Sequence, residues 1–128
     1  MTDCPFCARI TAGQFVLENS LAAAFLDGFP VSPGHTLIVP RRHAADFLEL
    51  SDQEQAAVWA LVGPVRRHIE KDHKPEGYNL GVNVGRAGGQ TVAHAHLHVI
   101  PRYSGDVDDP RGGIRWIIPA KAPYWRTS

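Results

Sequence analysis

Residues 94–100 read HAHLHVI, a strict alternation of histidine with apolar residues that ends in an apolar pair. Successive side chains of a β-strand point to opposite faces, so the alternation predicts a strand with three imidazoles on one face and apolar side chains toward a core. At about 3.3 Å of rise per residue, neighbouring imidazoles would lie about 6.6 Å apart. A row of groups that titrate near neutral pH can bind a metal, transfer protons or act as nucleophiles.

Apolar runs bounded by turn residues predict further strands before this motif. The expected strands cover residues 15–27 (as two short strands joined at 18–20), 35–40, 78–83 and 91–101, the last of which contains the histidines. Together with one long helix, these strands predict an α+β domain with a mainly antiparallel sheet packed against that helix.

The helix is expected between the strands at 35–40 and 78–83. Ser51 and Glu54 have the spacing of a capping box, in which each side chain accepts a hydrogen bond from the other residue's backbone amide. Apolar residues at helical spacing from Val58 to Ile69 form one stripe, so the helix should run to about residue 71. Pro64 lies inside it and should bend it, because proline lacks a backbone donor.

The composition excludes several classes of protein. Thirteen Lys+Arg balance thirteen Asp+Glu, so there is no overall basic charge to hold a nucleic acid. The apolar runs are a few residues long, as at 21–26, whereas a membrane span needs about 20, and the first residues lack the features of a secretory signal. We therefore expect a cytoplasmic protein of one domain, residues 1–128, whose partner is neither nucleic acid nor membrane.

A glycine-rich segment from Gly85 to Gln90 leads into the histidines. Glycines allow backbone N–H groups to converge on an anion, and Thr91 adds a hydroxyl donor just upstream of His96. Such segments are by themselves usually ordinary turns. Beside a row of imidazoles, however, this one predicts an anion-binding site.

The motif and its surroundings resemble the histidine triad (HIT) family, whose pattern is His-φ-His-φ-His-φ-φ with φ apolar. The family's usual GQTV sequence precedes the motif at 89–92, Asp27 lies eight residues before His35, and Asn83 lies thirteen before His96. These are the family's spacings. The resemblance covers about residues 4–102, followed by a C-terminal tail at 103–128. It implies a HIT-like fold, with a short N-terminal helix added to the sheet and the long helix.

The resemblance also implies an activity: hydrolysis or transfer at a bond next to the α-phosphate of a nucleotide, such as a dinucleoside polyphosphate or a nucleoside phosphoramidate. The middle histidine, here His96, would attack the α-phosphorus and form a covalent nucleotidyl-histidine, with the carbonyl of His94 holding its tautomer. His98 and His35 would be positively charged donors to the phosphate. The other nucleotide-binding positions would be Leu26, Asp27, Asn83, Gly89, Gln90 and Thr91, with Asp27 accepting from the ribose hydroxyls.

Three of these residues also have plain structural explanations. Asp27 could be a turn residue before Gly28, Asn83 a cap at a strand end, and His35 a core histidine at a strand start. Two other functions remain as alternatives. One is a nucleotidyltransferase of the same family, and the other is a regulatory zinc-binding module without covalent catalysis.

Cys4 and Cys7 form a CxxC pair, a spacing that places two thiolates on one tetrahedral zinc. Such a site needs two more ligands, and His43 and His94 are the candidates. In a subset of bacterial HIT proteins that the chain resembles, these four positions form a structural zinc site. The alternatives are two free thiols or, less in keeping with the sequence context, a redox pair. No organic cofactor is implied.

The tail beyond residue 102 carries Trp116, Tyr124 and Trp125 among several apolar residues. It resembles the tails of bacterial HIT hydrolases. These aromatic residues would either cover the partner subunit of a homodimer, the usual state of the family, or pack on the chain's own core.

Overall fold

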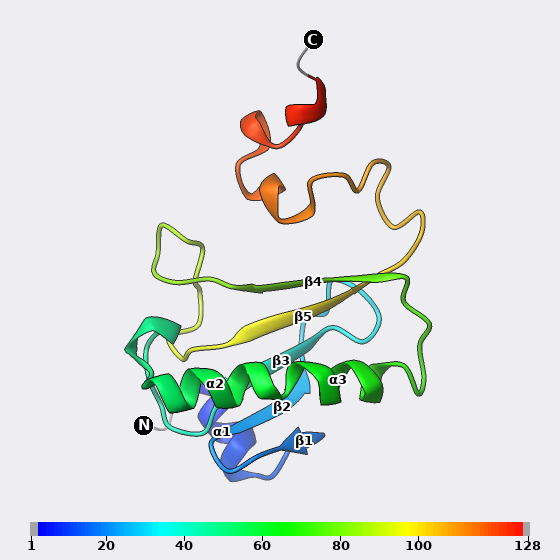
Figure 1. Cartoon of the computed structure of the whole chain (residues 1–128). Helices are drawn as coiled ribbons and strands as arrows, with labels where there is room; N and C mark the ends of the chain where they lie inside the picture. The colour runs from blue at the N-terminus through cyan, green and yellow to red at the C-terminus, as the bar shows by residue number, and fades with distance from the viewer. Residues whose placement is uncertain (1–2, 127–128) are drawn as a thin grey trace.

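Five antiparallel strands form one sheet in the computed structural model, which describes residues 3–126 (Figure 1). The strands are β1 (Leu17–Glu18), β2 (Ala22–Leu26), β3 (Thr36–Pro40), β4 (Gly77–Val82) and β5 (Leu97–Arg102). Their order across the sheet is β1-β2-β3-β5-β4, and every neighbouring pair is antiparallel. The expected α+β fold with a mainly antiparallel sheet is confirmed.

The long helix begins at the predicted capping box. The Ser51 hydroxyl accepts from the Glu54 amide at 3.1 Å, and the Glu54 carboxylate accepts from the Ser51 amide at 3.0 Å. The helix consists of α2 (Asp52–Ala60) and α3 (Val62–Ile69), which follow each other in the same direction (Figure 1). Pro64 has no N–H for the carbonyl four residues earlier, and its ring crowds that carbonyl, so α2 ends at Ala60.

Two apolar clusters cover opposite faces of the sheet. On one face, Ala24, Ile38 and Val99 pack with the buried residues of α2 and α3. On the other face, Phe25 and Leu37 pack with the short N-terminal helix α1 (Pro5–Thr11). Because neighbours such as residues 24 and 25 belong to different clusters, the alternation expected of half-buried strands is present. Leu97 and Val99 face the long helix, so the histidines between and beside them emerge on the α1 face.

The predicted strand at 91–101 is wrong at its start, since β5 begins only at Leu97. Residues 92–94 form a bend after the glycine-rich turn, and the amide of Ala95 donates to the carbonyl of Ala44 at 2.8 Å. His94 and His96 therefore precede the strand. The alternation of burial nevertheless continues through them, because Ala95 joins Leu97 in the core.

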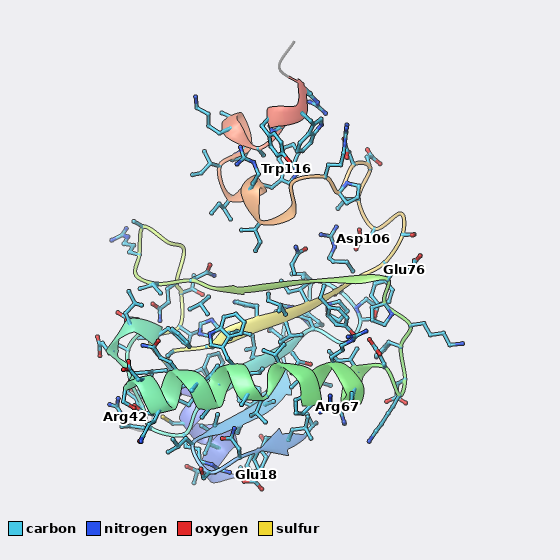
Figure 2. All side chains as sticks on the ribbon, viewed as in Figure 1. Glu18, Arg42, Arg67, Glu76, Asp106 and Trp116 are labelled. Carbon is cyan, nitrogen blue, oxygen red and sulfur yellow. The ribbon has the colours of Figure 1, made fainter. Side chains whose placement is uncertain are left out.

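The tail consists of short 3-10 helices, η2 (Gly113–Ile117), η3 (Pro119–Lys121) and η4 (Tyr124–Arg126). It extends beyond β4, as the position of Trp116 in Figure 2 shows. Aromatic rings pack within the tail. The ring centroids of Trp125 and Tyr124 are 5.2 Å apart, and the guanidinium of Arg111 lies over the Trp125 ring. None of the helices within residues 3–126 is long and apolar enough to cross a membrane.

Candidate functional site

Three histidines at the starts of two neighbouring strands meet on the α1 face of the sheet: His35 just before β3, His96 just before β5, and His98 within β5. The ring centroids of His96 and His98 are 5.0 Å apart, and those of His98 and His35 are 5.2 Å apart. His98 pairs with Gly81 of β4 and with Leu37 of β3 in the sheet register. Because Gly81 has no side chain, the tail can approach the sheet here, and a Cβ at this position would lie 3.6 Å from Cδ1 of Ile114.

His96 has its tautomer fixed by the backbone. Its Nδ1 lies 2.8 Å from the carbonyl oxygen of His94. A carbonyl only accepts hydrogen bonds, so neutral His96 carries its proton on Nδ1 and keeps a lone pair on Nε2. The edge of the Phe6 ring packs against this imidazole, with centroids 5.1 Å apart. The arrangement presents one bare, nucleophilic nitrogen from a buried and oriented ring.

His35 and His98 form a hydrogen-bonded pair in which both tautomers are fixed. The amide of Val31 donates to Nδ1 of His35 at 3.1 Å, so the proton of neutral His35 is on Nε2. Nε2 of His35 in turn lies 3.0 Å from Nδ1 of His98 and donates to it. His98 therefore carries its own proton on Nε2. It is a hydrogen-bond donor beside the bare nitrogen of His96.

Burial keeps this pair neutral in the free protein. Desolvation, followed by the neighbouring His96 and His35, lowers the pKa of His98 to about 4. Desolvation also lowers the pKa of His35, against the opposing effect of the Asp27 carboxylate. Both rings are thus neutral donors near pH 7. The positive charge expected for them from the sequence is not present before an anion binds.

Asp27 lies between a turn and the histidines. Its Oδ1 accepts from the amide of Phe29 at 2.8 Å, and its Oδ2 lies 3.4 Å from Nε2 of His35. The explanation of Asp27 as a turn residue is therefore confirmed, and the carboxylate also faces His35; its bond to the ribose hydroxyls stays a prediction. Leu26 precedes it at the exposed end of β2, where its carbonyl accepts from the guanidinium of Arg9 at 2.7 Å.

The glycine-rich segment folds into a tight turn of its own. The amide of Gly89 donates to the carbonyl of Arg86 at 3.0 Å, and the backbone of Gly89 has a φ of +91°, which favours glycine. The Gln90 carboxamide accepts from the Gly85 amide and donates to two carbonyls, those of Ala45 and Val92. In the free protein, both groups therefore stabilise the turn.

Asn83 and Thr91 are the predicted site residues whose side chains have no hydrogen-bond partner within residues 3–126. Asn83 follows β4 directly, one residue after the pairing of Val82 with Leu97. Thr91 lines a hollow of about 340 Å³ together with Cys4 and His43. Their polar groups are available to a ligand, and neither side chain is hydrogen-bonded to a histidine within residues 3–126.

Cys4, Cys7, His43 and His94 form a candidate metal centre. Their ligand atoms all lie within 4.8 Å of one another. The Sγ–Nδ1 distances are 3.3 Å (Cys4 to His94), 3.3 Å (Cys7 to His43) and 3.5 Å (Cys7 to His94), and the two Nδ1 atoms are 3.2 Å apart. Tetrahedral zinc with ordinary bond lengths would require about 3.5 Å for sulfur to nitrogen and about 3.3 Å for nitrogen to nitrogen. The residues fit zinc.

His94 is prepared as a ligand by its second nitrogen. Its Nε2 lies 3.0 Å from the carbonyl oxygen of Pro40 and donates to it, so Nδ1 keeps its lone pair toward the cysteines. Desolvation lowers the pKa of His94, which keeps the fully buried ring neutral. Burial, followed by the neighbouring Cys4 sulfur, raises the pKa of Cys7. A divalent cation would offset the unfavourable charge of two adjacent thiolates.

A second group, Asp27, His35 and His98, also brings three ligand atoms within 4.8 Å of one another. Here the Val31 amide occupies the lone pair on Nδ1 of His35, so Nε2 carries a proton. That proton lies where a metal would need a lone pair. The hydrogen bonds therefore favour the cysteine group as the metal centre.

Two contributors to the site had no clear signal in the sequence. Phe6 packs on both His94 and His96, at centroid distances of 5.8 and 5.1 Å, and only its place between the two cysteines hinted at this. Val31 acts through its backbone amide, which any residue but proline supplies, so no side-chain pattern marks it.

The model of the HIT domain family matches residues 10–105. The chain belongs to the HIT family. Among its relatives, adenosine 5'-monophosphoramidase of Schizosaccharomyces pombe is 42% identical over 104 residues, which is 78% of this chain and 74% of the relative. AP-4-A phosphorylase of Mycobacterium tuberculosis is 37% identical over 97 residues, 75% of this chain and 50% of the relative.

A solved HIT structure bears on the metal centre. It is a Zn-bound histidine triad family protein from Mycobacterium smegmatis, 32% identical, with a TM-score of 0.74. The match covers 81% of this chain and 78% of that one. Zinc binding in a HIT protein of the same fold agrees with the ligand distances found here.

Proposed function

We propose that this HIT protein is a nucleotide hydrolase that cleaves next to a nucleoside α-phosphate through a covalent intermediate on His96. The observation that carries the proposal is the bond from Nδ1 of His96 to the His94 carbonyl, which leaves Nε2 bare. A nucleophile on a buried ring needs such a fixed tautomer, and a donor, His98, lies beside it. The names of the two enzyme relatives support a nucleotide as substrate.

The reaction would proceed in two displacements. Nε2 of His96 bonds to the α-phosphorus while the bond from phosphorus to the leaving oxygen or nitrogen breaks. The Nε2–H of His98 donates a hydrogen bond to the leaving atom, which takes up its proton from water. Water then attacks the same phosphorus, its proton passes to solvent, and His96 leaves as neutral imidazole. The products are a nucleoside monophosphate and the protonated leaving group.

The remaining predicted residues would bind the nucleotide. Asn83 and Thr91 have free polar groups for the phosphate oxygens, and Asp27 would accept from the ribose hydroxyls. The amide of Gly89 and the side chain of Gln90 would contribute by shaping the turn, and the exposed Leu26 would contact the nucleoside. A hollow of about 610 Å³, lined in part by Ile100 two residues beyond His98, leaves space on the same face for the rest of the substrate.

Zinc would be structural in this proposal. Cys4, Cys7, His43 and His94 would hold it, and it would fix α1 and the His94 backbone without touching substrate. No organic cofactor is needed, because every proton and bond in the two displacements is supplied by imidazole, water and the nucleotide.

The decisive test is His96→Ala, assayed with adenosine phosphoramidate and diadenosine polyphosphates, with circular dichroism to verify folding. We expect a folded protein that no longer forms the covalent nucleotidyl adduct or turns over. Near-wild-type turnover would refute the nucleophile role. Adding phosphate to the wild type and identifying products separates the alternative nucleotidyltransferase, which would release a nucleoside diphosphate instead of the monophosphate.

We also propose that the protein is a homodimer. The tail exposes a group of large apolar side chains, with exposed fractions from 38% to 75%: Ile114, Trp116, Ile117, Ile118 and Tyr124. β4 is an edge strand beside it. Ile117→Lys should therefore shift the mass measured by sedimentation equilibrium from dimer toward monomer. Leu48→Lys, an exposed apolar residue far from the tail in sequence, is the matched control; equal effects would overturn the assignment.

A further inference from the structure

Two side-chain hydrogen bonds anchor the loop between β2 and β3 to the end of β5. The Ser32 hydroxyl donates to the carbonyl of Pro101 at 2.7 Å, and the Tyr103 hydroxyl donates to the carbonyl of Pro33 at 2.7 Å. Neither bond belongs to the sheet or to the histidine cluster. The loop supplies the donor of the first bond, and the residue after β5 supplies the donor of the second.

The geometry of the sheet explains why Pro101 needs a partner. The carbonyl of Arg102 accepts from Glu76 on the β4 side, so the carbonyl of Pro101 points the other way, toward β3. The last pair between these strands joins Thr36 and Val99, and Pro101 lies beyond it. The Ser32 hydroxyl thus replaces the backbone donor that a longer β3 would supply. Proline is tolerated at 101 because no neighbouring strand accepts a hydrogen bond from that position on this side.

The anchored loop supplies the amide that donates to His35. Val31 is adjacent to Ser32, and its amide donates to Nδ1 of His35 at 3.1 Å. The Val31 side chain is 72% exposed and so does little to hold the loop in place. The amide of His35 donates to the carbonyl of Ser32 at 3.1 Å within the loop, and the bonds of Ser32 and Tyr103 fix the loop, and with it the Val31 amide, to β5.

From the loop the effect passes to the reacting groups. A donor at Nδ1 of His35 requires a proton on Nε2, and that proton is donated to Nδ1 of His98 at 3.0 Å, with the Asp27 carboxylate at 3.4 Å on the same side. With Nδ1 of His98 occupied as an acceptor, its proton stays on Nε2. Without the Val31 donor, the opposite pair of tautomers becomes accessible, in which Nδ1 of His98 donates to His35 and Nε2 of His98 is bare.

We infer that Ser32 and Tyr103 are positioning residues, which hold the Val31 amide against His35 and thereby keep the proton of His98 on Nε2. The inference deepens the proposed function, since it concerns the N–H group with which His98 would hydrogen-bond to the leaving atom. Ser32 also lines the hollow of about 610 Å³, while the hydroxyls of both residues donate to backbone carbonyls. Their effect is on proton position in the free protein.

The test compares the double variant S32A/Y103F with the wild type and with Y78F. Tyr78 pairs with Pro101 in the sheet, and Tyr78→Phe removes a similar phenol hydroxyl, one that donates to Glu70 at 2.9 Å and not to the loop. Hydrogen exchange of the Val31 amide and the ¹⁵N resonances of the His35 and His98 rings are measured in the ligand-free protein at pH 8. Turnover of adenosine phosphoramidate is measured in parallel.

In S32A/Y103F we expect at least about tenfold faster exchange at Val31, shifted ring ¹⁵N signals of His35 and His98, and a fall in kcat with little change in KM. The fall in kcat should be about fivefold for each lost bond, because the net free energy of one intramolecular hydrogen bond corresponds to about that ratio. Ser32→Thr keeps the hydroxyl, so the double variant S32T/Y103F should give the same ring ¹⁵N signals as Y103F alone. Y78F should match the wild type in all of these measurements.

A lower kcat with unchanged ring signals would overturn the inference, because the loss would then be structural. Changed ring signals with unchanged kcat would overturn it as well. If the wild type turns over no nucleotide, the proposed function fails, yet the link from the anchor to the tautomers is still decided by the ligand-free spectra.

Discussion

The carbonyl oxygen of His94 lies 2.8 Å from Nδ1 of His96, while the ring of His94 is directed at the cysteines of the candidate metal centre. One residue therefore belongs to both clusters, with its ring in one and its backbone in the other. Phe6 adds a second link, since it follows Cys4 on α1 and packs on both imidazoles. Loosening the metal centre should consequently reach His96.

Cys4→Ala should abolish zinc binding and lower Tm by roughly 5–10 °C, because α1 loses its attachment to the sheet. Turnover should fall by about tenfold, the usual scale for residues that orient a reacting group from behind it. Elemental analysis, calorimetry and the phosphoramidate assay measure the three effects. Zinc that is retained without the cysteine, with activity lost on chelation, would instead indicate the alternative module in which the triad itself holds the metal.

Acid should destabilise the protein through His98. Its pKa is about 4 in the folded protein and about 6.5 when unfolded, so the unfolded chain binds the proton first as pH falls. The stability that the neutral ring contributes is present above pH 6.5 and is lost between about pH 6.5 and 4, up to roughly 3 kcal/mol. Urea denaturation of wild type and His98→Asn across this range measures it. The two curves should converge toward acid; parallel curves would contradict the burial effect.

The face on which the histidines lie could be predicted, but the extent of their strand could not. The alternation at 94–100 correctly places Leu97 and Val99 in the core and the imidazoles opposite. Ending a strand, however, depends on hydrogen bonds with distant residues, and the Ala95 amide finds Ala44 instead of a strand partner. The pattern of side chains does not indicate which carbonyl a given backbone amide will bind.

The capping box offers a test of a purely local prediction. Ser51→Ala removes the acceptor for the Glu54 amide at the start of α2 and should cost about 1 kcal/mol, or roughly 4 °C in Tm. Ser20→Ala, an exposed serine in a turn, is the control and should leave Tm unchanged. Equal Tm values for the two variants would mean that α2 is held by its packing alone.

The candidate site was predictable to the degree that it depends on spacing. The four metal-centre residues and the row His35, His96 and His98 follow from motifs and a family resemblance, and the structure brings each set together. What escaped prediction acts through backbone groups or through long-range bonds, such as the Val31 amide and the Tyr103 hydroxyl. Any residue but proline has the same amide, so no sequence pattern marks it.

Asp27 permits a test that separates binding from positioning, since its carboxylate faces both the turn and His35. Asp27→Asn keeps an acceptor for the Phe29 amide but loses the charge. If the carboxylate accepts from ribose hydroxyls, kcat/KM should fall about 10- to 100-fold for a ribonucleoside phosphoramidate, mainly through KM. The value of kcat/KM should hardly change for the 2',3'-dideoxy substrate, which cannot make those bonds. Asp27→Asn and the removal of the ribose hydroxyls thus form a double-mutant cycle. An equal loss of kcat on both substrates would show that Asp27 acts through His35 instead.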